Sequence, residues 1–328
     1  MPSHPAPPLP YHRLAHLRPE TARWWRPLAA LGTVLGLALA SGLLIIFGMV
    51  IASFAVPGWR MSDTLEDPTN PADLLFLLGS LAVLIPVVVL GMRWGGGMRG
   101  TIHSVVGRVR WRMMLRAASV VIPLYALVIG ISSAVSPPDD LATPPLDART
   151  VTVFVVILLL VPLQCAAEEY AFRGLPQQLL GTWLRSPVWG IVLPVPLFMV
   201  GHGYDWAGQV DLATFALCAG FLVWKSGGLE LAIVVHVANN LILFLLAPFS
   251  PSSLHQGATD PAGLLLTLPL TLLTTWGLTA WVSRTHGLRL LEPVRSAARR
   301  QEDPVAVPVP VPVPSPSPER APATGTRA

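Results

Sequence analysis

Residues 151–174 read VTVFVVILLLVPLQCAAEEYAFRG, and this stretch decides the fold. A long apolar run ends in two adjacent carboxylates, Glu168 and Glu169, with Arg173 four residues after the second. Ionisable side chains at membrane depth are costly, and they usually face a protein interior or a wet cavity. The stretch therefore predicts a membrane helix that carries a functional site, whose polar partners must lie on other helices.

The composition of the whole chain agrees with a membrane location. The 328 residues are 52% hydrophobic and only 12% charged, with a mean hydropathy of +0.59. A soluble domain does not have this composition. Apolar runs of about 20 residues recur along the chain, as transmembrane helices require, and they lack the alternation of a transmembrane β-barrel. We therefore predict an all-α fold, a polytopic membrane bundle of about eight transmembrane helices.

The charges predict how the bundle is oriented. The net charge of +4 comes almost entirely from arginines that lie between the apolar runs, where positive loops mark the cytoplasmic side. Six arginines and no acid occur from Arg93 to Arg116, whereas the segments around Asp63 and Asp139 are acidic. We expect an integral protein of the cell membrane with both termini in the cytoplasm. Its surroundings are the lipid bilayer, and no nucleic-acid partner is expected.

The chain divides into four predicted parts. Residues 1–26 form a cytoplasmic tail rich in Pro and Arg, 27–136 hold three transmembrane helices and the basic loop 93–116, 150–283 form the membrane core with the polar site, and 284–328 form a basic segment and a tail. Predicted spans cover 27–56, 73–91, 117–135, a run from 151, 188–201, 212–224, 229–246 and 262–282. The Val-Pro alternation at 304–318 is typical of an extended, disordered segment without a core.

Helical spacing separates the roles of the polar residues. Positions four apart share a helix face, and this spacing joins Glu169 to Arg173, Phe198 to His202, and His236 to Asn240. Arg173 can thus neutralise Glu169, while Glu168 points about 100° around the helix. We interpret Glu168 as the carboxylate that remains free to act as a general base or acid.

Two further helices supply groups that suit a hydrolytic site. His202 and His236 can ligate a metal or hold a water, and His236 with Asn240 can donate to a developing oxyanion. Each element also has an ordinary structural explanation. Glu169 with Arg173 is a possible structural ion pair, His202 an interfacial histidine, and Asn240 a polar contact between helices. The placement of all these groups on separate helices, where one cavity can gather them, favours a site.

Three motifs resemble a known family. Glu168-Glu169-Tyr-Ala-Phe-Arg173 resembles the Glu-Glu-x-x-x-Arg motif of the CPBP intramembrane proteases, which are also called Abi or CAAX prenyl endopeptidases. Phe198-Met-Val-Gly-His202 and His236-Val-Ala-Asn-Asn240 resemble the second and third motifs, Phe-x-x-x-His and His-x-x-x-Asn. Their order and approximate separation also match, over roughly residues 150–250.

The resemblance implies an intramembrane endopeptidase with an eight-helix bundle and a site that opens toward the cytoplasm. It implies that Glu168 activates a water with help from His202, and that His236 and Asn240 stabilise the tetrahedral oxyanion. Glu169 and Arg173 would support the site. The implied partner is a peptide or protein substrate at the membrane.

Metal dependence stays open at this point. A Glu with two His, here Glu168, His202 and His236, resembles the ligand set of a catalytic divalent metal such as Zn²⁺. No His-Glu-x-x-His motif is present, so a water held by Glu and His alone is the other possibility. Two other functions use the same residues: a transporter that relays protons or ions, and a non-catalytic membrane scaffold.

One expectation concerns depth in the membrane. If the fourth span starts at Val151 and the fifth at Val188, the rise per residue places Glu168 near one surface and His202 much deeper. For the two to meet, either the helix continues past Glu168 toward Gly174 or beyond, or the fifth helix starts deeper or tilts after Pro194 and Pro196. We expect both adjustments.

Overall fold

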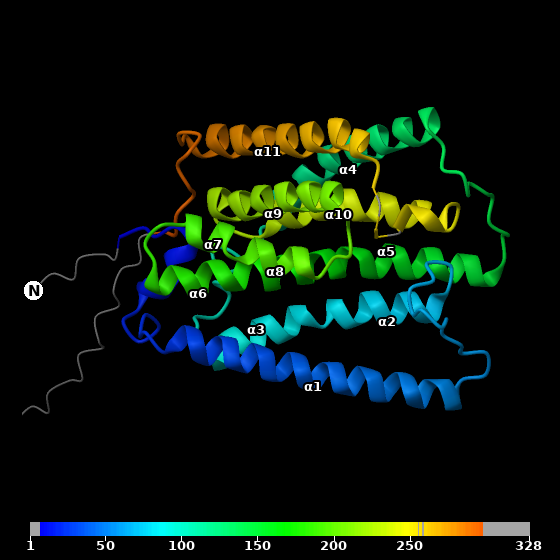
Figure 1. Ribbon diagram of the computed structural model, residues 1–328. Coiled ribbons are helices and arrows are strands. Elements are labelled where there is room, and N and C mark those ends of the chain that lie inside the picture. The colour runs from blue at the N-terminus through cyan, green and yellow to red at the C-terminus, as the bar shows by residue number, and fades with distance from the viewer. Residues whose placement is uncertain (1–6, 255, 258, 298–328) are drawn as a thin grey trace, which may run out of the picture. The chain divides into compact units, whose positions relative to one another are not determined.

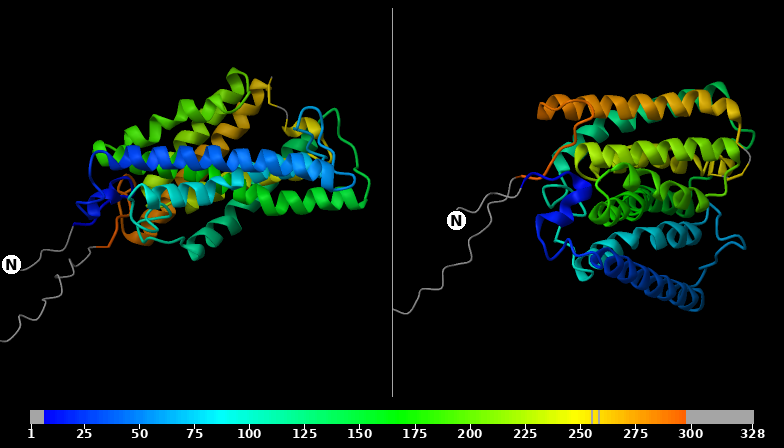
Figure 2. Two further views of the ribbon diagram at one scale, coloured as in Figure 1. Left: turned by 90° about the horizontal axis from the view of Figure 1, so that it is seen from below. Right: turned by 60° about the vertical axis from the view of Figure 1, so that its left-hand side comes forward.

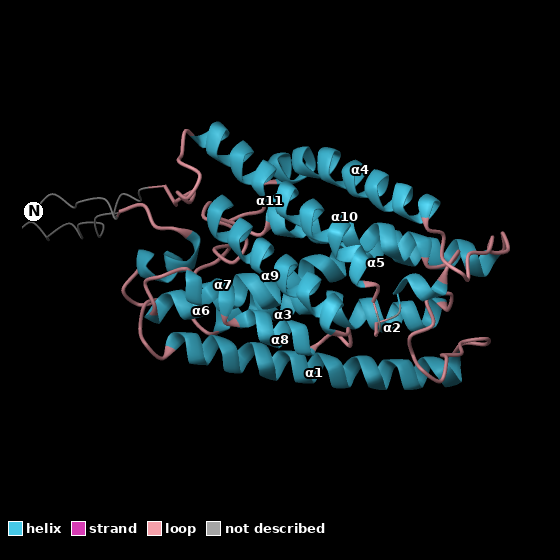
Figure 3. Ribbon diagram, turned by 45° about the horizontal axis from the view of Figure 1, so that its top comes forward, coloured by secondary structure: helices cyan, strands magenta, loops and turns pink. Residues whose placement is uncertain are grey.

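The apolar runs form helices in the computed structural model, which describes residues 7–254, 256–257 and 259–297. The α-helices are α1 (Arg26–Ala55), α2 (Pro71–Ala82), α3 (Leu84–Trp94), α4 (Trp111–Val135), α5 (Ala148–Glu169), α6 (Leu175–Trp183), α7 (Val188–Val192), α8 (Pro194–Val200), α9 (Trp206–Ser226), α10 (Glu230–Leu246) and α11 (Leu264–His286). Short turns are η1 (Tyr11–Leu17), η2 (Tyr170–Gly174), η3 (Pro251–Leu254) and η4 (Pro261–Gly263). Over the described residues, Figure 3 shows helices and loops without a strand. The Val-Pro-rich segment 304–318 lies outside the described residues.

The helices confirm the predicted polytopic bundle. In the described part of the chain, six helical segments are long and apolar enough to cross a membrane: 26–55, 71–94, 111–135, 148–183, 206–226 and 261–286. Two shorter apolar helices, 188–200 and 230–246, account for the remaining predicted runs. The long helices lie roughly side by side in the ribbon (Figure 1). Helix α5 lies inside the bundle, in contact with α2, α3 and α10.

Two glycines allow α3 to approach α1 closely. A Cβ atom on Gly91 would lie 2.3 Å from the Cγ2 atom of Val34, and one on Gly95 would lie 2.2 Å from the Cα atom of Ala30. Small residues at such spacing are the usual means by which membrane helices pack backbone to backbone. Figure 2 shows α1 and α3 as neighbours at one side of the bundle.

The basic and acidic segments gather at opposite ends of residues 8–297. At the basic end, the Ser296 N–H donates to Leu9 O at 2.9 Å, and Lys225 Nζ donates to Glu292 O at 2.5 Å. Figure 1 shows the N-terminal segment and the end of α11 near this end. At the acidic end, Asp140 accepts a hydrogen bond from the Ser252 N–H at 2.8 Å. The separation predicted from the charges is therefore present in the fold.

The first residues pack against the bundle. We call residues 10–17 the N-terminal strap, and its side chains bond the carbonyl groups at the end of α6. His12 Nε2 lies 3.0 Å from Arg185 O, His16 Nε2 lies 3.1 Å from Thr182 O, and Arg13 Nη1 donates to Gly181 O at 2.5 Å. These carbonyls would otherwise be unpaired at the helix C-terminus. The sequence indicated only a tail over 1–26 and gave no sign of this packing.

Candidate active site

The helix that carries the two glutamates is longer than its apolar run. α5, η2 and α6 form one continuous segment of 36 residues, Ala148–Trp183. The expectation that the helix continues past Glu168 is therefore confirmed. Directly after Glu169 the helix widens into the π-helical turn η2, and such turns occur frequently at functional sites. The predicted fifth helix is split at Leu193, so that α8 begins at Pro194.

Glu169 is the centre of a buried ion cluster. Its Oε1 atom lies 3.2 Å from Arg173 Nη1 and 2.8 Å from His236 Nδ1. Glu169 is 0%, Arg173 2% and His236 4% exposed, so solvent screens these charges little. The pairing with Arg173 one turn away is the one the spacing predicts. The bond to His236 fixes the imidazole ring of α10 against the glutamate helix.

Glu168 meets the other nitrogen of the same ring. Its Oε2 atom lies 3.5 Å from His236 Nε2, and Asn240 Nδ2 lies 3.3 Å from that nitrogen. Glu168, His236 and Asn240 thus converge on one point between α5 and α10. The predicted pairing of His236 with Asn240 is present, and no arginine or lysine among the described residues forms an ion pair with Glu168.

His202 packs against the phenylalanine of its own motif. The Phe198 ring centroid is 4.8 Å from that of His202 and 6.5 Å from that of His236. His202 Nδ1 lies 2.9 Å from Phe198 O. Because a carbonyl oxygen only accepts, Nδ1 of the neutral ring carries the hydrogen and Nε2 keeps its lone pair. His202 therefore presents an acceptor nitrogen, and it is half-buried.

The turn that carries His202 is held from α9. Gln209 Nε2 donates to His202 O at 2.8 Å, and the Tyr204 ring stacks on the His202 ring with centroids 6.1 Å apart and an interplanar angle of 11°. Asp205 caps α9 by accepting from the Gly208 N–H at 3.1 Å. These contacts limit the movement of the histidine.

Phe215 is a site residue that the sequence did not indicate. Its ring centroid lies 4.9 Å from that of His236 and 5.3 Å from the Arg173 guanidinium carbon. Phe198 lies 4.0 Å from the same carbon, so two aromatic faces enclose the buried cation. From the sequence alone, a phenylalanine within an apolar helix cannot be distinguished from a residue that only packs in the core.

The predicted metal ligands can be compared with the positions of the described side chains. Among the described residues, no three His, Cys, Asp or Glu side chains are close enough together to hold a metal ion. Glu168 and His236 are adjacent, and the rings of both His202 and His236 lie near the Phe198 ring. Metal binding by Glu168, His202 and His236 stays a prediction.

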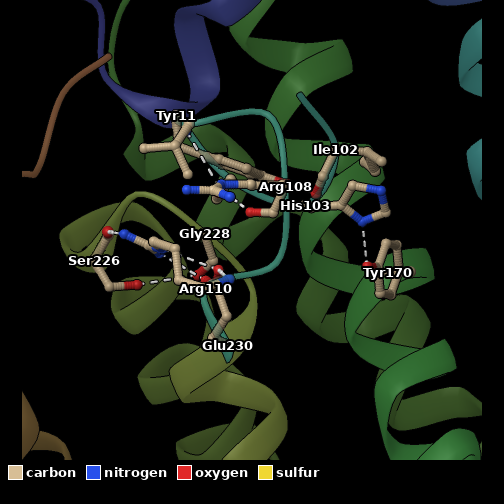
Figure 4. Close-up of polar contacts among 11 residues, drawn as sticks. Tyr11, Ile102, His103, Arg108, Arg110, Tyr170, Ser226, Gly228 and Glu230 are labelled. Atoms are coloured by element: carbon tan, nitrogen blue, oxygen red, sulfur yellow. Dashed lines mark hydrogen bonds and ion pairs between the residues drawn. The ribbon is translucent and has the colours of Figure 1, made fainter. Parts of the chain in front are cut away.

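The basic loop connects the two helices that meet at the site. His103 Nδ1 bonds the hydroxyl of Tyr170, the residue after Glu169, and His103 O accepts from the Leu229 N–H at 3.1 Å, just before α10 (Figure 4). Tyr11 of the strap donates from its hydroxyl to Ile102 O at 2.5 Å. Burial lowers the pKa of His103 below its usual value. The sequence suggested only an orientation signal for this loop.

An ion pair fastens the same loop to the start of α10. Arg110 Nε lies 2.9 Å from Glu230 Oε1, and Nη2 lies 2.6 Å from Oε2. Nη1 also donates to Ser226 O at 2.7 Å, as Figure 4 shows. This two-point geometry is the strong form of an arginine–carboxylate contact. One predicted orientation arginine thus has a structural partner.

The fold and this cluster define a polytopic membrane protein with a buried glutamate–histidine site. Residues 150–242 match the family described as type II CAAX prenyl endopeptidase Rce1-like. The match contains Glu168, His202, His236 and Asn240. The predicted resemblance is thereby confirmed: the segment that carries the three motifs is similar to the CAAX prenyl endopeptidases.

The chain was also compared with individual proteins and with solved structures. The chain is 26% identical over 236 residues to the uncharacterized protein YyaK of Bacillus subtilis (strain 168), a match that covers 67% of this chain and 76% of the relative. The similarity therefore extends beyond the segment with the site residues. No solved structure gave a significant match.

Proposed function

We propose that this protein is an intramembrane endopeptidase in which Glu168 activates the hydrolytic water. The observation that carries the proposal is the convergence of Glu168, His236 and Asn240 on one buried point within the family-matched segment. A carboxylate next to donors for an oxyanion is the arrangement that amide hydrolysis by water requires. The substrate class is a peptide or protein segment at the membrane.

Each residue of the cluster has its own role in the proposed hydrolysis. Glu168 takes a proton from water as the water oxygen attacks the scissile carbonyl carbon, and it returns that proton to the leaving amine. His236 and Asn240 donate to the carbonyl oxygen as it becomes an oxyanion, which requires a proton on His236 Nε2. Glu169 orients the His236 ring through Nδ1, and Arg173 balances the charge of Glu169. His202 positions the water through Nε2.

This mechanism has no metal step. Among the described residues, Glu168, His202 and His236 are not gathered closely enough to hold a metal ion, so in the proposed scheme side chains alone hold the water. The resemblance to prenyl endopeptidases makes lipid-anchored peptides the first substrates to test. Cleavage of an unmodified membrane peptide is equally consistent with the cluster.

The test is hydrolysis of membrane peptides by the purified full chain in lipid. We expect Glu168→Gln to lower kcat about 10²- to 10⁴-fold, the usual contribution of a general base. Glu66→Gln is the matched control, because Glu66 is exposed in the loop before α2. Full activity of Glu168→Gln would refute the mechanism. Glu168-dependent proton flux without cleavage would instead favour a transporter.

A further inference from the structure

A cavity lies between the N-terminal strap, the start of α1, the end of α3 and α6, at the basic end of the bundle (Figure 1). Its walls include Leu14 of the strap, Met92 of α3 and Leu179 of α6, and of the described residues that line it Arg26 alone is charged. The cavity has a volume of about 30 Å³ and is partly open to the outside. One water molecule needs roughly 10–15 Å³, so a small polar group that belongs to a larger molecule can enter.

The neutral polar side chains around the cavity already use their donors within the protein. The hydroxyls of Thr21, Thr101 and Thr182 donate to backbone carbonyl groups at 2.5, 2.9 and 3.0 Å. Gln178 Nε2 donates to Thr101 O at 2.6 Å. The guanidinium of Arg26 is therefore the main polar group that the cavity offers to a ligand.

Arg26 is a half-buried cation, and the ion pairs among the described residues do not include it. Its Nε atom is shielded from solvent and has no hydrogen-bond partner there, while Nη1 approaches Gly95 O only to 3.5 Å. The guanidinium carbon lies 4.4 Å from the centroid of the Trp25 ring, which covers one side of the group. Withdrawal of a charge from water is costly unless an opposite charge balances it. The cavity therefore favours an anion beside Arg26.

Gly96 provides the space in which the guanidinium lies. Its φ of +95° is in the left-handed region, which favours glycine. A Cβ atom at this position would lie 2.0 Å from Arg26 Nη1. The backbone after α3 is thus shaped around the cation and holds it at the edge of the cavity.

Exposed tryptophans indicate the depth of the cavity in the membrane. Trp24, Trp25, Trp94 and Trp183 are 71%, 38%, 60% and 43% exposed, and they lie at or next to the ends of α1, α3 and α6. Trp183 Nε1 also donates to Trp24 O at 2.8 Å. Tryptophans gather where the hydrocarbon meets the headgroups. The anion that is abundant at this level is the phosphate of a phospholipid.

We propose that this cavity binds the headgroup of an anionic phospholipid, with the phosphate at Arg26 and the glycerol ester against the apolar walls. A free phosphate ion is best held by several donors, whereas one cation beside apolar side chains matches a phosphate ester on an apolar chain. Residues 18–26 also carry Arg18 and Arg23 against the single acid Glu20, which favours a lipid with a net negative charge.

The lipid site is independent of the candidate active site. None of the residues that line the cavity belongs to the glutamate–histidine cluster, so the proposal does not rest on the proposed function. The strap forms one wall, and α1, α3 and α6 form the others. A bound lipid would therefore contact the strap and three helices at once.

Native mass spectrometry of the full chain tests the site. The protein is released from nanodiscs that contain equal amounts of phosphatidylcholine and phosphatidylglycerol, and the lipids that remain bound are counted. We expect one phosphatidylglycerol to be retained in preference to phosphatidylcholine. Equal retention of the two lipids by the unaltered protein would overturn the proposal without any substitution.

Variants of Arg26 assign the retained lipid to the cavity. We expect Arg26→Gln to weaken the retention of phosphatidylglycerol about tenfold, as for the loss of one charge-assisted hydrogen bond. Arg23→Gln is the matched control, because Arg23 is an exposed arginine of the same segment, and it should retain the lipid. Arg26→Lys keeps the charge and should recover part of the retention, which separates loss of the charge from loss of the fold. Equal retention in Arg26→Gln and Arg23→Gln would place the lipid elsewhere and refute the assignment.

Inorganic phosphate distinguishes a lipid headgroup from a free anion. An excess of inorganic phosphate added during release should leave the phosphatidylglycerol bound, since the apolar walls contribute to its binding. Displacement of the lipid by phosphate alone would overturn the proposal of a lipid site in favour of a site for a free anion.

Discussion

Glu168 and Glu169 are neighbours in sequence but face different surroundings. Glu169 contacts both Arg173 and His236 Nδ1 through its Oε1 atom, at 3.2 and 2.8 Å. Glu168 has only the looser contact of 3.5 Å to His236 Nε2. A carboxylate held by two close donors makes a good support and a poor base, whereas a loosely held one can accept a proton. The contacts thus agree with the division of roles that we derived from helical spacing.

His103 is expected to affect catalysis without touching substrate. Because it bonds Tyr170 and the start of α10, it helps to set the distance between Glu169 and His236. We expect His103→Ala and Tyr170→Phe each to lower kcat about fivefold, the effect of one lost hydrogen bond, with little change in KM. The double variant should be no worse than either single variant.

Rescue and control variants separate this role from general instability. His103→Gln keeps a side-chain amide that can bond Tyr170, and it should recover part of the activity. His286→Ala removes an exposed histidine at the end of α11 and should have no effect. Additive losses in the double variant would show that His103 and Tyr170 act independently.

Metal removal gives a further expected outcome at the residue scale. Since Glu168, His202 and His236 are not gathered into a metal-binding group among the described residues, we expect peptide hydrolysis to survive dialysis against a chelator. The measurement is kcat before and after dialysis, with the metal content determined in parallel. Loss of activity that Zn²⁺ restores would return Glu168, His202 and His236 to the role of ligands.

At the scale of elements, the N-terminal strap is expected to respond to pH. Burial lowers the pKa of His12 and of His16 from 6.5, and the nearby Arg13 acts in the same direction. A histidine whose pKa is lowered by folding stabilises the docked form fully above pH 6.5, and this contribution is lost as the pH falls through the lowered value. A nitroxide on Arg18→Cys, an exposed position, should therefore gain mobility on acidification.

A substitution at Gly181 tests whether the contact with α6 holds the strap in place. A Cβ atom there would lie 1.7 Å from His12 O, so Gly181→Ala should release the strap and leave the label mobile at every pH. Gly36→Ala is the control, because nothing lies within 4 Å of its Cβ position. An immobile label in Gly181→Ala would show that the strap is held elsewhere.

Local features of the sequence predicted the local features of the structure. Apolar runs located the helices because hydrophobic length is a property of each segment, and the spacing of Glu169 and Arg173 predicted their contact because both lie on one helix. The π-helical turn, the position of His236 between two glutamates and the contact of His103 with Tyr170 depend on packing between distant segments. No single segment of the sequence carries that information.

At the scale of the whole molecule, the segregated charges predict orientation. The arginine-rich loop, the strap and the segment after α11 meet at one end, and the acidic loops lie at the other. From the positive-inside rule we expect the basic end to face the cytoplasm. We expect a membrane-impermeant maleimide to label Asp139→Cys in intact cells and Arg99→Cys only after permeabilisation, since both positions are exposed. The reverse pattern would invert the proposed topology.

The π-helical turn after Glu169 changes the number of residues in one turn of the helix. A π turn contains one residue more than an α turn, so it behaves as a single-residue insertion in a helix. It offsets the angular register of α6 from that of α5, by roughly the 100° that one residue occupies. The continuous helix α5–η2–α6 can therefore direct its glutamates into the bundle and direct a different face, that of α6, toward the strap. Deleting a single residue from this turn would bring the faces of α5 and α6 back into one angular register. No side-chain substitution reproduces that change.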